Sequence, residues 1–247
     1  MKKMNLLVLI LLQFSFHAYA RKAAPPVEKT PSTTISSDKT EATPAAQISV
    51  ADPSITDKVS EITFEDVHIS SYSSLLSQGK TTDLKMVNHG IRKKKVFGLA
   101  TVKVYVVEFF AADPSKLDKT EDGILNSLKK AGAVELKLTM SRDLAGTKIT
   151  SSFKEALEHN GLDINNLSKE MSELMTELSS VKEFEKGQSF SLLATWKDTT
   201  ATLFIKRADG SIKTITGNEV FATDLFAIWF GKPADDKLAE LKKSLIK

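Results

Sequence analysis

The sequence predicts an α+β domain in which an antiparallel sheet carries a layer of helices on one face. Two observations predict this class. Runs rich in β-branched and aromatic residues recur along the chain, and very short connections join the last three of them. Between and after these runs, apolar residues recur instead at the helical spacing of three to four positions.

The expected strands are short, and tight turns separate the last three. The turn at 208–210 ends in Gly210 and is typical of a β-hairpin. In the run 188–196, apolar side chains alternate with serines, which indicates a sheet with one more polar face. We expect strands over 61–69, 96–111, 134–140, 188–196, 200–207 and 211–216.

Four helices are expected. Thr150 or Ser151 can cap a helix that ends at Gly161, and Asn218 can cap a strongly apolar helix that ends at Gly231. The apolar stripe over 167–178 indicates core packing rather than a methionine-rich binding surface. A polar helix over about 235–246 closes the chain.

The first twenty residues have the composition of an export signal. Lys2 and Lys3 form a positive start, residues 6–16 are apolar, and Ala18-Tyr19-Ala20 fits a cleavage site. The apolar run is too short for a membrane anchor, which needs about 20 residues. We therefore expect a signal peptide over 1–20, cleaved after Ala20, and a protein exported to the periplasm without a stable membrane anchor.

Residues 21–60 have the composition of a disordered linker. Five of the seven prolines lie there, among threonine, serine and alanine, and no aromatic residue does. A proline-rich recognition segment is the alternative, although no clean motif repeats. The expected folded domain is 61–247, a normal length for one domain.

Charge and cysteine content exclude several classes of partner and site. Without Lys2 and Lys3, 32 basic residues face 31 acidic ones, so the net charge of +1 gives no reason to expect nucleic acid. The chain has no cysteine, which excludes disulfides, thiol catalysis and zinc–thiolate sites.

Most catalytic signatures are absent as well. The sequence contains no G-x-S-x-G, H-E-x-x-H, G-x-G-x-x-G or phosphate-binding loop. Outside the leader, His68, His89 and His159 are far apart and lack the spacing of metal ligands. We therefore expect neither a metal nor a cofactor.

The basic run 92–95 and the acid Glu108 each allow two interpretations. The run fits either an anion-binding patch or a solvated sheet edge, and alternation along a strand favours the edge. Glu108 lies within an apolar strand, where it either pairs with a lysine or faces solvent. Neither feature is assigned a catalytic role.

Arg92 and Tyr105 are the candidate ligand-binding residues. A buried guanidinium needs an anionic partner, which is either a side chain or a ligand. The two residues are thirteen positions apart, so on one uninterrupted strand they would face opposite sides unless Gly98 interrupts it. From the residues alone a salt-bridged surface arginine is favoured over a ligand-binding one.

The segment that contains both residues has a recognisable pattern. It reads N-x-G-[IV]-R and then, after roughly ten residues, K-V-Y-V-x-x-[FLY]-[FY]. The matching positions are Asn88, Gly90, Ile91, Arg92, Lys103, Val104, Tyr105, Val106, Phe109 and Phe110. Further matches are Ser141-Arg142-Asp143 with Phe153 and Leu157, and the block 217–231 with Trp229. In the order and spacing of these motifs, the chain resembles the chalcone isomerase-like family over about 80–245.

This resemblance implies an open-faced β-sandwich with a ligand cleft between the sheet and the helices. Family members are either isomerases that cyclise chalcones or non-catalytic binders of fatty acids. In both groups the arginine after the glycine meets the anionic oxygen of the ligand, which corresponds to Arg92, and Tyr105 matches the fatty-acid binders. The polar catalytic positions of the isomerases correspond here to Ile149, Ala156 and Ile228.

Three functions follow from the resemblance. The leading one is an exported, non-catalytic protein that binds a fatty acid or similar amphipathic carboxylate, with Arg92 and Tyr105 on the anionic head. The second is an isomerase or intramolecular lyase of the chalcone isomerase type. The third is an interaction protein that uses the fold only as a scaffold, with Arg92 paired to an internal acid such as Glu108.

Overall fold

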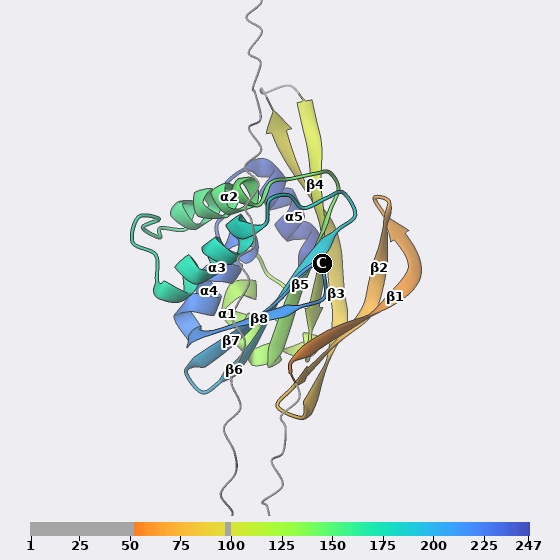
Figure 1. Cartoon of the computed structure of the whole chain (residues 1–247), viewed down its shortest axis with the longest axis vertical. Coiled ribbons are helices and arrows are strands. Elements are labelled where there is room, and N and C mark those ends of the chain that lie inside the picture. Colours follow the sequence, from red (N-terminus) through yellow and green to blue (C-terminus); the bar gives the residue numbers. More distant parts are fainter. Residues whose placement is uncertain (1–51, 97–99) are drawn as a thin grey trace, which may run out of the picture. The chain divides into compact units, whose positions relative to one another are not determined.

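The computed structural model describes residues 52–96 and 100–247, which build a curled sheet with helices on one side (Figure 1). Its eight strands are ordered β1 to β8 and every neighbouring pair is antiparallel, which confirms the predicted fold class. The strands are β1 (Ser54–Phe64), β2 (Val67–Ser77), β3 (Lys80–Val96), β4 (Ala100–Ala111), β5 (Ala133–Met140), β6 (Ser189–Lys197), β7 (Thr200–Lys206) and β8 (Ile212–Asn218).

Short helices follow β4, two longer helices separate β5 from β6, and two more follow β8. The α-helices are α1 (Ile124–Ser127), α2 (Gly146–His159), α3 (Lys169–Ser180), α4 (Glu219–Phe230) and α5 (Asp236–Leu245). Two 3₁₀ turns, η1 (Pro114–Lys116) and η2 (Leu128–Ala131), flank α1. As expected, the Asn218 side chain caps α4 by accepting a hydrogen bond from the Phe221 amide at 2.9 Å.

The main core lies between the helices and the sheet. Phe109, Leu136 and Leu138 point from β4 and β5 toward α4, and all three are fully buried. Phe226 and Phe230 of α4 pack against this face, with the Phe109 and Phe230 rings 4.9 Å apart. Because α4 is apolar almost all round, it lies at the centre of the helical layer.

The other face of the sheet is covered too, by the β1–β2 hairpin. Ile55 and Leu75 of the hairpin pack with Phe110, Leu193 and Phe204 in a second, smaller core. The alternation in β6 correctly indicates a more polar face, but the hairpin buries that face instead of leaving it to solvent.

The N-terminal boundaries differ from the expected ones. The sequence predicts one strand over 61–69, but Glu65 and Asp66 have φ values of +50° and +67° and turn the chain between β1 and β2. Strand β1 begins at Ser54, so residues 54–60 belong to the sheet and not to the linker. The serine-rich strand β2 has too few apolar residues to be found from its pattern.

Helix α2 also begins earlier than expected, at Gly146. The hydroxyl groups of Thr150 and Ser151 do not cap the helix but donate hydrogen bonds to the Thr147 carbonyl inside it. A Cβ atom on Gly146 would lie 2.2 Å from the Leu178 carbonyl oxygen, so only glycine allows α2 to begin this close to α3.

Helix α5 packs directly on β3, and Gly90 makes this possible. A Cβ atom at Gly90 would lie 2.8 Å from Leu241 Cδ1 and 3.0 Å from Ser244 Cβ, both on α5. The glycine of the N-x-G-[IV]-R pattern is therefore a packing requirement, because it brings α5 to the strand that carries Arg92.

A buried cluster of charged side chains joins the β1–β2 hairpin to the sheet. The Asp57 carboxylate accepts a hydrogen bond from Lys206 at 2.8 Å and lies 3.7 Å from the Lys137 ammonium. Glu108 accepts from the Ser70 amide at 2.6 Å and lies 3.5 Å from Lys137. Of the two interpretations of Glu108, pairing with a lysine is the correct one, and the solvent-facing alternative is wrong.

Glu135 is the least satisfied member of this cluster. It is fully buried, and neither carboxylate oxygen has a hydrogen-bond partner. Burial and, second, the nearby Asp57 carboxylate raise the pKa of Glu135 from 4.5 to about 7. The folded state is therefore more stable with a neutral Glu135 than with a charged one.

Replacement of Glu135 by glutamine should remove a pH-dependent loss of stability. Because the pKa is raised, the folded state favours the neutral form of Glu135. The resulting stabilisation is fully present below pH 4.5 and is lost as the pH rises through about 7. Between about pH 5 and about pH 8, the free energy of unfolding of the wild type should fall by up to about 3 kcal/mol more than that of Glu135→Gln. Urea denaturation at both pH values measures this difference, and the exposed Glu158→Gln is the matched control. Parallel pH profiles for all three proteins would contradict the assignment.

Replacement of Gly90 by alanine should lower the free energy of unfolding by roughly 1–3 kcal/mol, because the new methyl group overlaps α5. The double variant Gly90→Ala/Leu241→Ala should lose less stability than the two single variants together, since Leu241→Ala removes the overlapping atoms. Urea denaturation of the four proteins measures this coupling. Strictly additive losses would show that Gly90 and Leu241 do not meet.

Candidate functional site

Strands β3 and β4 bring Arg92 and Tyr105 together. The two strands are antiparallel, and Arg92 is the direct cross-strand partner of Tyr105. The chain therefore reverses between the two residues, so the expectation of opposite faces on a single strand does not apply. Gly98, the expected site of interruption, lies outside the described residues.

An internal carboxylate pairs with Arg92. The two terminal nitrogens of Arg92 donate to the two oxygens of Asp235, Nη1 to Oδ1 at 2.8 Å and Nη2 to Oδ2 at 2.5 Å. Arg92 Nη1 also donates to the Lys93 carbonyl. Arg92 is only 8% exposed, so this bidentate pair supplies the anionic partner that the buried guanidinium needs. Glu108, which was suggested as the internal partner of Arg92, is not that partner.

Asp235 binds Arg92 and also caps helix α5. It is the N-cap residue, and its Oδ1 accepts a hydrogen bond from the Leu238 amide at 2.8 Å. Burial opposes the charge of Asp235, but the hydrogen bonds from Arg92 and from the Leu238 amide, together with the positive charges of Arg92 and Lys94, lower the pKa of the carboxyl group. Burial likewise opposes the charge of Arg92, and the bonds to Asp235 raise the pKa of the guanidinium. Each group therefore keeps the other ionised.

Tyr105 lies beneath the helical layer, with its hydroxyl group next to Trp229. Trp229 Nε1 of α4 donates to the Tyr105 oxygen at 3.3 Å, and Phe153 of α2 packs edge-on against the indole at 5.0 Å. Burial raises the pKa of Tyr105, although the positive charge of Arg92 opposes this. The phenol therefore keeps its proton and can donate a hydrogen bond to an acceptor.

The positions that correspond to the polar catalytic groups of the isomerases are hydrocarbon here. Ile149, Ala156 and Ile228 are all buried in the core between sheet and helices. No side chain at these three positions can orient a polar substrate or hold a bridging water. The core beside Arg92 and Tyr105 is filled by apolar side chains.

The three lysines of the basic run lie on a solvated edge, as expected, whereas Arg92 is buried. Lys94 pairs with Glu155 of α2 at 3.0 Å, and Lys95 pairs with Asp236 of α5 at 2.6 Å. Lys93 lies 4.0 Å from Glu65 in the β1–β2 turn. Acidic side chains thus neutralise the run locally, which leaves little free charge for an external polyanion.

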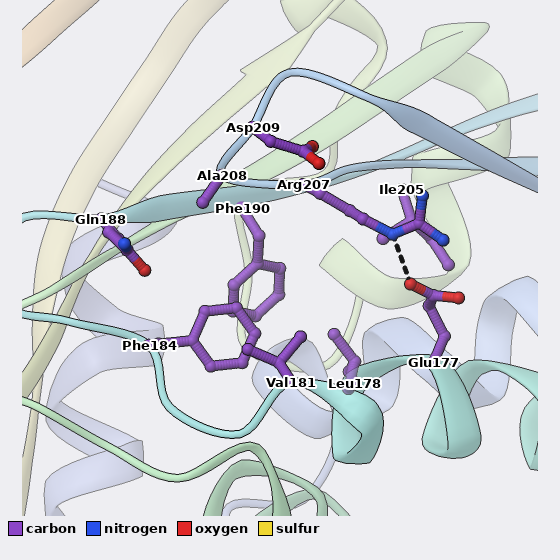
Figure 2. A pocket seen from close by; sticks show the side chains of 10 residues that line it. All are labelled: Glu177, Leu178, Val181, Phe184, Gln188, Phe190, Ile205, Arg207, Ala208 and Asp209. Atoms are coloured by element: carbon purple, nitrogen blue, oxygen red, sulfur yellow. Dashed lines mark hydrogen bonds and ion pairs between the residues drawn. The ribbon is translucent and has the colours of Figure 1, made fainter. Parts of the chain in front are cut away.

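A separate apolar pocket of about 210 Å³ opens between the end of α3 and the strands β6 and β7 (Figure 2). Phe184 and Phe190 form its inner wall, with ring centroids 5.1 Å apart. At its rim, Arg207 Nε donates to Glu177 Oε1 at 2.5 Å. No sequence pattern identifies this pocket, because its residues come from α3, the loop after it, the start of β6, and the end of β7 with the turn that follows it.

Two kinds of feature are absent from residues 52–96 and 100–247. No group of three or more histidine, aspartate and glutamate side chains in this part of the chain is placed to hold a metal ion. None of its helices is long and apolar enough to cross a bilayer.

Comparisons with known proteins agree with the fold. Curated proteins gave no match. Among solved structures, a fatty-acid binding protein of Arabidopsis thaliana superposes with a TM-score of 0.51 at 12% sequence identity, over 66% of this chain and 86% of that chain. At that identity the likeness concerns the fold alone. The profile of the chalcone isomerase-like family matches residues 64–246. The chain therefore belongs to the chalcone isomerase-like family.

Proposed function

We propose that this protein is a non-catalytic binder of a fatty acid or a similar amphipathic carboxylate, whose head lies at Arg92 and Tyr105. The observation that carries the proposal is the bidentate pair of Arg92 and Asp235, in which the guanidinium already holds a carboxylate. The Tyr105 hydroxyl belongs to the cross-strand partner of Arg92, where it is available as a second donor. The fatty-acid binding protein with the same fold adds support.

In this proposal the ligand's carboxylate replaces that of Asp235. The Arg92 side chain is 9% exposed, whereas that of Asp235 is 29% exposed and can turn into water. The exchange of one bidentate carboxylate for another keeps the buried guanidinium paired, at a cost of about 1 kcal/mol for the cap that Asp235 gives to α5. Affinity then comes from the acyl chain, at about 0.8 kcal/mol for each methylene removed from water.

The same pair favours a second candidate function. If Asp235 is the permanent partner of Arg92, the fold serves as a scaffold for interactions elsewhere on its surface and holds no small ligand. Catalysis of the chalcone isomerase type has less support, because hydrocarbon occupies the three positions of the isomerases' polar groups. A substitution that removes the charge of Asp235 distinguishes the carboxylate binder from the scaffold.

We further propose export to the periplasm, on the strength of the leader sequence, which lies outside the described residues. Intact-mass analysis of the protein from a periplasmic fraction should give a chain that begins at Arg21. A full-length chain recovered from the cytoplasm would contradict export.

The binding proposal predicts opposite effects for two substitutions. Asp235→Asn keeps a good helix cap but removes the competing charge, so it should bind dodecanoate about tenfold more tightly than the wild type. Arg92→Ala should abolish measurable binding, whereas Arg142→Ala, at an exposed arginine, should behave as the wild type. Isothermal titration calorimetry with the purified proteins measures all four affinities.

Ligand carried from the cell gives an independent readout. Mass spectrometry of small molecules released on denaturation should find acyl carboxylates in the wild type and Asp235→Asn, and none in Arg92→Ala. If neither the wild type nor Asp235→Asn carries or binds a carboxylate, the scaffold function is the correct one. Binding that persists in Arg92→Ala would remove Arg92 from the site.

A further inference from the structure

The β1–β2 hairpin and the start of β3 form a flap, residues 54–84, that joins the rest of the sheet along a single strand. Strand β3 pairs with β2 through residues 80–85 and with β4 through residues 85–96, so Lys85 alone belongs to both ladders. The hairpin lies on the side of the sheet away from the helices (Figure 1). Its position on that face therefore depends on contacts of side chains rather than on a ladder shared with β4.

The face beneath the flap is a row of apolar side chains that contains one acid. Glu135 of β5 is the cross-strand partner of Phe110 on β4 and of Leu193 on β6, and Leu193 lies opposite Phe204 of β7. Phe110, Glu135 and Leu193 are all fully buried. The two positions directly across from Glu135 are thus hydrocarbon, and neither can donate a hydrogen bond to its carboxylate.

The flap does not satisfy this carboxylate either. Both oxygens of Glu135 lack a hydrogen-bond partner, and so do the Ser73 hydroxyl and Oδ1 of Asp57 on the flap. Glu108 Oε2 is a fifth such atom at this interface, and the part of the chain that the structure describes contains only six. Because buried polar groups normally have partners, the closed flap is the least satisfied interface among the described residues.

The charged groups around Glu135 do not compensate for its burial. Lys206 of β7 donates to Asp57 of β1 at 2.8 Å, and Lys137 of β5 lies 3.5 Å from Glu108, its cross-strand partner on β4. Both lysines are therefore engaged with other carboxylates. Burial first and the Asp57 charge second raise the pKa of Glu135 to about 7, although the positive charge of Lys206 opposes this.

Apolar contacts and a few polar ones hold the flap closed. Ile55 and Leu75 pack on the apolar row. The Ser70 amide donates to Glu108 at 2.6 Å, and Lys137 donates to the Ser70 hydroxyl at 2.8 Å. A charged Glu135 works against these contacts, because closure removes the carboxylate from water and gives it no partner.

We propose that residues 54–84 are a pH-controlled flap, which a neutral Glu135 keeps closed and an ionised Glu135 opens about Lys85. Opening hydrates the Glu135 carboxylate and exposes the apolar row of Phe110, Leu193 and Phe204. The helical side of the sheet keeps its own core and stays folded, so the event is local.

The size of the effect follows from the two protonation equilibria of Glu135. In the open flap the carboxyl group reaches water and has its ordinary pKa of 4.5, whereas in the closed flap the pKa is about 7. The stabilisation of the closed flap is fully present below pH 4.5 and is lost as the pH rises through about 7. From about pH 6 to about pH 8, the equilibrium constant for opening should therefore increase about tenfold.

Hydrogen exchange followed by mass spectrometry measures this opening in the purified protein. After correction for the intrinsic exchange rate, amides of β2 should lose about tenfold in protection from about pH 6 to about pH 8. In Glu135→Gln their protection should be the same at both pH values, since glutamine does not ionise. Glu158→Gln, at an exposed glutamate, is the matched control and should behave as the wild type. Amides of α4 should keep their protection in all three proteins.

Two results would overturn the flap. The first is an equal pH dependence of β2 in the wild type and in Glu135→Gln, which would remove Glu135 as the controlling group. The second is an equal loss of protection in β2 and α4, which would show that the whole domain opens and not the flap.

A thiol introduced beneath the flap gives a second readout, which keeps Glu135 and serves if Glu135→Gln does not fold. The chain has no cysteine, so a single introduced thiol is the only one to react. Ser73 is fully buried and its hydroxyl makes no hydrogen bond, which suits Ser73→Cys. Ala156→Cys, in the core beneath α2, is the control. From about pH 6 to about pH 8, the rate of labelling by iodoacetamide should rise about tenfold more in Ser73→Cys than in Ala156→Cys. Equal increases in the two variants would contradict the flap.

Discussion

The paired charges of Arg92 and Asp235 connect every part of the candidate site. A guanidinium that is 8% exposed on a strand of the sheet must have an anionic partner, and the first residue before α5 supplies it. The same aspartate caps α5, and Gly90 lets that helix lie directly on β3. One ion pair therefore fixes the helix, the strand and the polar end of the core together, and any ligand at Arg92 must compete with it.

Polar groups are buried in different ways on the two faces of the sheet. Beneath the helices, few polar side chains lie among the hydrocarbon, and Tyr105 has a partner in Trp229. Beneath the β1–β2 hairpin, the carboxylates of Asp57 and Glu108 share two lysines, and Glu135 is left without a hydrogen bond. The helical side is thus an apolar core with one buried ion pair at its end, while the hairpin side is sensitive to pH.

Much of the fold could be predicted from local signals. The Asn218 cap, the turn at 208–210 and the apolar stripe of α3 each act within a few residues, so they are visible in the sequence. Strand β2 was missed because serines on both faces hide its alternation. The partner of Arg92 was missed because Asp235 is 143 positions away, and only the packing of α5 on β3 brings the two together. The apolar pocket was missed for the same reason, since two stretches of the chain, 177–190 and 205–209, form it.

The measurement that tests the central claim most directly is a crystal structure of the protein with dodecanoate. The account predicts a carboxylate in bidentate contact with Arg92 and in hydrogen-bonding distance of the Tyr105 hydroxyl, with the Asp235 side chain turned toward solvent. An intact Arg92–Asp235 pair, with dodecanoate bound elsewhere or absent, would contradict it and would make the pair a structural element alone.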